Sequence, residues 1–149
     1  MNTIRITKRF TFEMAHALLG YDGLCKNIHG HSYILWVSLK GTPINDKNNV
    51  KNGMLMDFSE LSMLIKTHIV QKFDHALLLN KSTPSQDLKH ISPAFERLYL
   101  TDYQPTCENL LVDFAQQITS LLPSQVQLHS LKLQETETSF AEWFADDNK

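Results

Sequence analysis

The chain has 149 residues, a length that fits one domain with a hydrophobic core and is too short for two, so we expect one domain over residues 1–149. Its content of 42% hydrophobic and 20% charged residues is typical of a globular protein, and a formal charge of −2 offers no positive field for nucleic acid. No apolar stretch approaches the ~18 to 20 residues of a membrane span. The N-terminus shows no signal-peptide pattern, which predicts a cytoplasmic protein.

Two strands are predicted in the first 40 residues. Between residues 3 and 16 most apolar residues share one parity, and His16 falls in phase with them. From about residue 29 to residue 40 a second run alternates in the same way, and it begins with His29 and His31. A polar, glycine-containing loop joins the two runs. An antiparallel hairpin is therefore expected.

Two helices and two further strands follow in the pattern. Apolar residues recur at helical spacing after Asp57, which can cap the first helix. A second helix begins with Thr106 as its N-cap and ends at Pro123. Residues 126–137 and the segment SFAEWFA (139–145) have the composition of strands. The order β-β-α-α-β-β predicts an α+β domain, with an antiparallel sheet and two helices on one of its faces.

The hairpin brings three histidines together. His16 leaves the first strand where His29 and His31 enter the second, and alternate residues of a strand share a face at ~6.6 to 6.8 Å. Imidazoles that lean over such a gap can share one ion at ~2.0 to 2.1 Å. Three imidazoles favour zinc over magnesium or calcium, while iron and copper stay open. The alternative is three strand histidines bonded to backbone or water.

Two cysteines, Cys25 and Cys107, are too few for a disulfide framework. Cys25 lies four residues before His29 and has three interpretations. It is a fourth ligand of a closed structural zinc site, a nucleophile or base beside an open site, or an incidental loop cysteine. Cys107 has no histidine near it in the sequence, and only the third interpretation applies to it.

A His-x-His pair on a strand also occurs in the cupins, which are a different class of protein. Their motif places a glutamate four or five residues after the second histidine. This chain has Leu35 and Trp36 there, so a cupin metal set would be incomplete. A cupin-like oxygenase is therefore the weaker interpretation.

Two further polar groups are candidates for chemistry. Asp74 directly precedes His75, and a carboxylate can fix the tautomer of a histidine and raise its basicity. Glu135 shares the parity of Leu131 and Leu133, so it should face inward. An inward carboxylate can accept two parallel N–H bonds from a guanidine-like edge of a ligand. The alternative is a strand-end glutamate in solvent.

Six segments form an ordered set that spans nearly the whole chain. They are FTFEMAH (10–16), CKNIHGHSY (25–33), GMLMDFSEL (53–61), FDHALLLN (73–80), PTCEN (105–109) and LQET (133–136). Together they resemble the 6-pyruvoyl-tetrahydropterin synthases and their bacterial relatives, the 6-carboxy-5,6,7,8-tetrahydropterin synthases of queuosine biosynthesis. The resemblance implies the tunnelling fold, in which the sheets of several subunits join into a barrel, commonly as a hexamer built from two trimers.

The resemblance also implies roles for individual residues. Zinc would be held by His16, His29 and His31, and the substrate would be 7,8-dihydroneopterin triphosphate, whose side-chain hydroxyls take the open coordination position. Cys25 would be the general base rather than a ligand. The proton relay would come from Asp74 and His75 of a neighbouring subunit. The residues that bind the pterin would be Thr106, Glu108 and Glu135, and Glu135 would also join the proton relay.

The spacing Cys-x-x-x-His-Gly-His is similar to the queuosine branch of the family. That branch loses triphosphate and splits a carbon–carbon bond, which releases acetaldehyde and leaves 6-carboxytetrahydropterin. Two alternatives stay open: a pyruvoyl-type synthase that only eliminates triphosphate, and a zinc- and pterin-binding oligomer without turnover. The cations that could hold the triphosphate are not distinguished by the sequence; they are Arg5, Lys8, Arg9, Lys26 and Lys40.

The segment at about 81–104 is longer than the link expected in many members of the family. Its Ser, Thr and Pro content predicts an extended surface loop, with a short helix or strand near PAFERLYL (93–100). Because the segment connects FDH to PTCEN, it could border the pocket and alter specificity. More often such an insertion is a neutral loop.

Overall fold

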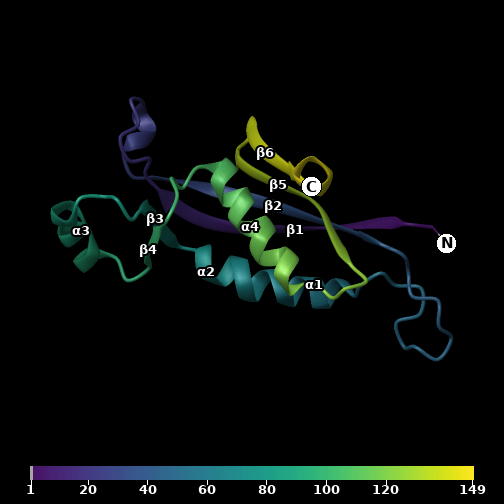
Figure 1. Ribbon diagram of the computed structural model, residues 1–149. Helices are drawn as coiled ribbons and strands as arrows, with labels where there is room; N and C mark the ends of the chain where they lie inside the picture. The colour runs from purple at the N-terminus through teal and green to yellow at the C-terminus, as the bar shows by residue number, and fades with distance from the viewer. Residues whose placement is uncertain (1) are drawn as a thin grey trace.

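The computed structural model describes residues 2–149, and its centre is one sheet of six strands in the order β4-β3-β1-β2-β5-β6 (Figure 1). The expected hairpin is present, since β1 (Ile4–His16) pairs antiparallel with β2 (His29–Gly41) along its whole length. Next to β2 lies β5 (Gln127–Thr136), followed by β6 (Ser139–Phe144), and both pairings are antiparallel. These four strands match the predicted antiparallel sheet.

Two further strands extend the other edge of the sheet; β3 was not predicted, while β4 lies where a short helix or strand was expected near residues 93–100. β3 (Ala76–Asn80) pairs with β1, and β4 (Leu98–Thr101) pairs with β3, both in parallel. The sheet is therefore mixed rather than purely antiparallel. The first four residues of β3 are all buried, and such a continuous apolar run lacks the alternation by which the other strands are recognised.

The predicted two helices lie on one face of the sheet (Figure 1). The first begins as α1 (Phe58–Ile65), passes through a π-helical segment, Lys66–Val70, and ends as α2 (Gln71–Phe73). The second is α4 (Cys107–Leu121), whose N-cap is Thr106, as predicted. No helix within residues 2–149 is long and apolar enough to cross a membrane.

The hydrophobic core lies between this helical layer and the inward face of the central strands. Phe12 stacks on Tyr33 with their ring centroids 5.3 Å apart, and Phe114 of α4 meets both Phe12 and Phe73 edge to face. Aromatic pairs of this kind add to the stabilisation that burial provides. His16 is the next inward residue after Met14 on β1, and only 2% of its surface is exposed. The side chain of His16 therefore lies at one end of the hydrophobic core.

The segment 81–104 lies beside the parallel edge of the sheet, at the end of the molecule where β3 and β4 are found (Figure 1). It contains the short helix α3 (Ser85–Ile91), a 3-10 turn over Ser92–Ala94, and strand β4. A small second apolar cluster packs it onto the sheet; the buried members of that cluster are Ala17, Leu77 and Leu79. The segment is thus attached to β3 rather than extending freely.

The N-cap of α1 offers a test of this fold. The Asp57 carboxylate accepts hydrogen bonds from the backbone N–H and the hydroxyl of Ser59, each at 2.7 Å, and these bonds hold the pKa of Asp57 below its usual value. We expect Asp57→Ala to lower the melting temperature by about 2 to 4 °C at pH 7. Because the folded pKa is depressed, this contribution is present above the pKa of the unfolded chain and is lost as the pH falls through the folded value.

Thermal unfolding measured at pH 7 and at low pH checks this expectation. Asp57→Asn is the matched control, because its side-chain oxygen can still accept the cap hydrogen bond. An equal loss in Asp57→Ala and Asp57→Asn at pH 7 would contradict the capping role.

Candidate metal and substrate site

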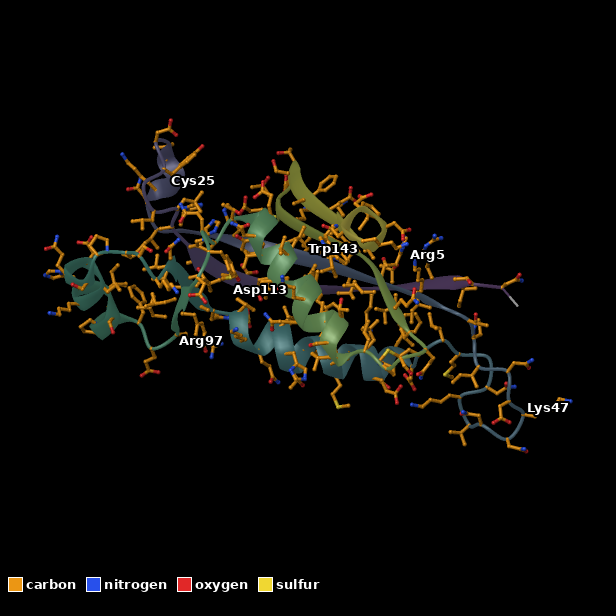
Figure 2. All side chains as sticks on the ribbon, in the orientation of Figure 1. Arg5, Cys25, Lys47, Arg97, Asp113 and Trp143 are labelled. Atoms are coloured by element: carbon orange, nitrogen blue, oxygen red, sulfur yellow. The ribbon has the colours of Figure 1, made fainter. Side chains whose placement is uncertain are left out.

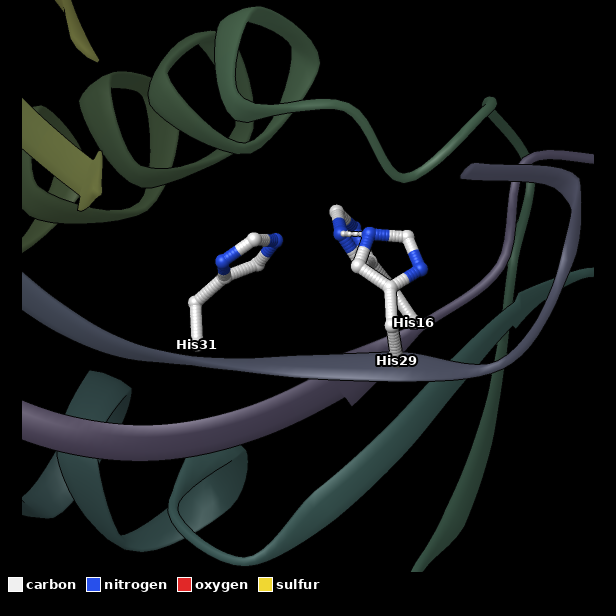
Figure 3. A group of neighbouring side chains, drawn as sticks. All are labelled: His16, His29 and His31. Carbon is white, nitrogen blue, oxygen red and sulfur yellow. Dashed lines mark hydrogen bonds between the residues drawn. The ribbon is translucent and has the colours of Figure 1, made fainter. Parts of the chain in front are cut away.

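The antiparallel register of β1 and β2 brings the three predicted histidines together. His16 lies directly opposite His29, and His31 lies opposite Met14, so the three side chains project from neighbouring positions on the same face. One ring nitrogen from each residue lies within 4.8 Å of the others, and the Nε2 atoms of His16 and His29 are 3.0 Å apart (Figure 3). We call these residues the histidine triad.

Backbone carbonyls fix the orientation of two of the rings. The Nδ1 atom of His16 is 2.7 Å from the carbonyl oxygen of Pro105, and Nδ1 of His29 is 2.7 Å from that of Asn27. A carbonyl only accepts hydrogen bonds, so both Nδ1 atoms carry the proton and donate it. Both Nε2 atoms therefore present a lone pair toward the centre of the triad, which is the tautomer that metal-binding histidines commonly adopt.

The third ring, that of His31, has an unpaired nitrogen. Its Nε2 atom is buried and has no hydrogen-bond partner within residues 2–149. Burial lowers the pKa of both His16 and His31, which favours their neutral forms, although the nearby Glu135 opposes this shift. The Nε2 lone pairs of His16 and His29 face each other at 3.0 Å, and two such lone pairs repel unless a cation lies between them. The donor set therefore fits a metal ion that prefers imidazole ligands.

Glu135 faces inward beside the triad, as its parity predicts. Its Oε1 atom accepts a hydrogen bond of 3.0 Å from the Tyr33 hydroxyl and lies 3.5 Å from Nε2 of His16 and 3.6 Å from Nε2 of His31. Tyr33 is fully buried, and burial together with the Glu135 carboxylate raises the pKa of its phenol, so the phenol keeps its proton and donates it. Tyr33 could not be recognised as a site residue from the sequence, because a buried strand tyrosine carries no distinguishing pattern.

The N-terminus of α4 is adjacent to the triad because the carbonyl of Pro105 holds His16. Thr106 accepts a hydrogen bond from the backbone N–H of Asn109 at 3.2 Å, and Glu108 is exposed in the first helical turn. Cys107 is buried, and its thiol donates to the carbonyl of Leu133 at 3.3 Å. Burial raises the pKa of this thiol to about 12, so it stays protonated.

Cys25 lies on the loop between the two histidine-bearing strands. It is exposed and belongs to a short 3-10 turn, Leu24–Lys26, that projects beyond the sheet (Figure 2). Within residues 2–149, the group of side chains able to hold one ion consists of the triad without Cys25. This arrangement does not support Cys25 as a fourth ligand, and it leaves the thiol free.

Asp74 and His75 form a hydrogen-bonded pair, although neighbouring residues on a regular element would point apart. His75 adopts a left-handed backbone conformation with φ of 58°, which turns its ring toward Asp74. Its Nδ1 atom is 3.1 Å from Oδ1 of Asp74, and the same oxygen accepts the backbone N–H of Glu13 at 2.9 Å. Partial burial acts in the opposite direction, but these hydrogen bonds hold the pKa of Asp74 below its usual value.

A cavity of about 650 Å³ lies beside His75 and reaches one histidine of the triad, His31, while His16, His29 and Asp74 are not among its lining residues within residues 2–149. Within residues 2–149 its lining includes His31 and His75 but not Cys25. The segment 81–104 contributes one wall through its residues Ala94 to Arg97. The segment therefore borders the cavity beside His75.

Comparison with known proteins identifies the family. The sequence model of 6-pyruvoyl tetrahydropterin synthase matches residues 5–146. The chain belongs to the 6-pyruvoyl tetrahydropterin synthase family. Its relatives in this family include the 6-carboxy-5,6,7,8-tetrahydropterin synthase of Haemophilus influenzae, which is 33% identical over 141 residues that cover 93% of this chain and 97% of the relative. The 6-pyruvoyl tetrahydrobiopterin synthase of Dictyostelium discoideum is 32% identical over 149 residues, and the match covers 93% of this chain and 93% of the relative.

Two solved structures share the fold. The 6-pyruvoyl tetrahydropterin synthase of Caenorhabditis elegans superposes with a TM-score of 0.67 at 21% identity, over 97% of both chains. An uncharacterized protein from Wolinella succinogenes gives a TM-score of 0.77 at 19% identity, over 97% of this chain and 99% of its own. A single chain therefore has the subunit architecture of the tunnelling fold that the sequence resemblance implied.

Proposed function

We propose that the protein is a zinc-dependent lyase of queuosine biosynthesis. It would convert 7,8-dihydroneopterin triphosphate and one water molecule to 6-carboxy-5,6,7,8-tetrahydropterin, acetaldehyde and triphosphate. The observation that carries this proposal is the histidine triad, in which one ring nitrogen from each residue converges on a common point while backbone carbonyls hold the Nδ1 atoms of His16 and His29. The relative from Haemophilus influenzae, named as a 6-carboxytetrahydropterin synthase, supports the choice of product.

In this proposal His16, His29 and His31 hold the zinc ion. When bound, zinc lowers the pKa of the substrate's side-chain hydroxyls and stabilises the negative charge that develops on them. The carbonyls of Pro105 and Asn27 keep two of the rings in the ligating tautomer.

Cys25 is the proposed general base, and Asp74 with His75 relays protons. Two observations support these roles. The Cys25 thiol is exposed and separate from the triad, and the Asp74–His75 pair has the geometry by which a carboxylate orients an imidazole. Since Cys25 does not line the cavity beside His75 within residues 2–149, we assign the two groups at one site to different subunits.

The pterin ring is proposed to bind at Glu135, with Thr106 and Glu108 lining its pocket. Glu135 is pre-oriented by the hydroxyl of Tyr33, and a carboxylate can accept the amino and ring N–H groups of a pterin through two parallel hydrogen bonds. Glu135 is also proposed to join the proton relay, and its position 3.5 Å from Nε2 of His16 suits that role. Thr106 follows directly on the residue that holds His16.

We also propose a hexamer of cytoplasmic subunits, built as a dimer of trimers from one tunnelling-fold domain per chain. Strands β4 and β6 are the two edges of the sheet, and an unpaired edge is commonly covered by another chain. The assignment of Cys25 and His75 to different subunits requires that the chain form an oligomer, and the hexamer is the assembly that the family resemblance implies.

Mass spectrometry of the pterin products, with acetaldehyde trapped in parallel, tests the proposed function. The zinc-loaded protein is mixed with 7,8-dihydroneopterin triphosphate, and chelated protein is the control. We expect 6-carboxytetrahydropterin and acetaldehyde only with zinc. A 6-pyruvoyl product without acetaldehyde would instead make the protein a pyruvoyl-type synthase. Unchanged substrate would favour the alternative of a pterin-binding oligomer without turnover.

A further inference from the structure

We propose that Arg97, in the segment 81–104, is a positioning residue that fixes the Asp74–His75 pair in its relay geometry. The inference rests on the proposed function, because it takes His75 as a proton-relay group. From the sequence, the segment 81–104 has two interpretations, a loop that alters specificity or a neutral insertion. The proposal gives this segment a defined part in the reaction.

The guanidinium group of Arg97 binds the chain immediately before His75. One of its terminal nitrogens, Nη2, donates to the carbonyls of Gln71 at 2.6 Å and Lys72 at 3.1 Å, and Nε donates to the carbonyl of Asp74 at 3.1 Å. The last carbonyls of a helix have no partner within the helix and carry partial negative charge. Arg97 therefore caps the end of α2, and Figure 2 shows it beside that end of the helix.

The backbone of Arg97 is also tied to the strand that follows His75. Its carbonyl accepts the N–H of Leu77 at 2.9 Å, the first rung of the β3–β4 ladder. Arg97 thus bonds to residues on both sides of His75 in the sequence. A guanidinium suits this task because its planar group presents several donors in fixed directions.

Positioning matters at His75 because its backbone conformation is an uncommon one. A positive φ at a non-glycine residue persists only where surrounding contacts impose it. Glu13 supplies contacts from the β1 side, since its carbonyl accepts the N–H of His75 at 2.6 Å and its own N–H donates to Asp74. Arg97 supplies the contacts from the opposite side, and the turn is held between the two residues.

Arg97→Ala tests the inference through the rate of the reaction. We expect kcat to fall about 10- to 100-fold, as small displacements of a catalytic group do, with KM and zinc content nearly unchanged. In a His75→Ala background, Arg97→Ala should have no further effect, because the group that Arg97 positions is gone. If kcat fell by the same factor in both backgrounds, the positioning role would be wrong.

Controls separate this role from general destabilisation. Lys89→Ala removes an exposed cation of the same segment that makes no side-chain hydrogen bond or ion pair within residues 2–149, and it should leave kcat unchanged. If Arg97→Ala does not fold, Arg97→Lys keeps the charge but not the fork of donors. We then expect Arg97→Lys to lower kcat, and wild-type kcat in that variant would overturn the inference.

A readout that needs no turnover distinguishes failure of this inference from failure of the proposed function. The imidazole signals of His75 can be assigned by NMR from their loss in His75→Ala. Arg97→Ala should shift these signals, and Lys89→Ala should not. If the wild type shows no turnover, the proposed function fails and the NMR comparison alone decides whether Arg97 positions His75. Unchanged His75 signals in Arg97→Ala would overturn the inference.

Discussion

Cys25→Ala is expected to leave the zinc content unchanged and to lower turnover by about 10²- to 10⁴-fold. The magnitude is that typical of losing a general base. The metal should stay because the three imidazoles of the triad supply the protein ligands without the thiol. The thiol is exposed on a loop outside the ligand group. Metal analysis and kcat, measured on the same preparation, check the two parts of the expectation.

Cys107→Ala is the matched control for this variant. It also removes a thiol, but one that is buried and bonded to the carbonyl of Leu133, and it should retain both zinc and turnover. Loss of zinc from Cys25→Ala would make Cys25 a ligand and favour a closed structural site. Unchanged zinc together with unchanged turnover would refute its role as the base.

His29→Ala is expected to abolish both zinc binding and turnover. Loss of an outer-shell partner already weakens metal affinity by about 10- to 100-fold, and loss of a direct ligand should exceed that. His29 is preferred to His16 for this test because His16 is buried at the end of the core, so its replacement would also affect folding. Added zinc should raise the melting temperature of the wild type and leave that of His29→Ala unchanged.

His68→Ala serves as the control for the second test, because His68 is an exposed histidine on the π-helical segment of the long helix. It should bind zinc as the wild type does. Stoichiometric zinc in His29→Ala would show that the metal is held elsewhere than in the triad.

The hairpin and the triad could be predicted because both follow from one simple periodicity. Parity along β1 and β2 decides which side chains share a face, and it placed His16, His29 and His31 together in the way the register now shows. The same argument placed Glu135 inward. These features need only residue identity and spacing.

Contacts made by backbone carbonyls could not be predicted in this way. Every residue has a carbonyl, so no pattern indicates that Pro105 would hold His16 or that three carbonyls before His75 would bind Arg97. Strand β3 was missed for a related reason, since its buried run ALLLN lacks alternation. The left-handed turn at His75 has no glycine to indicate it.

The full-length pairing of β1 with β2 also determines where the chain can change length. Because successive strand residues face opposite sides of the sheet, deleting one residue between Phe10 and His16 would rotate His16 away from its partners. Deleting two would restore the face but move the imidazole by one rung, about 6.6 to 6.8 Å. Lengthening the exposed connection over residues 45–50 moves no histidine. Engineered insertions, such as an affinity tag or a fluorescent domain, therefore belong in that connection.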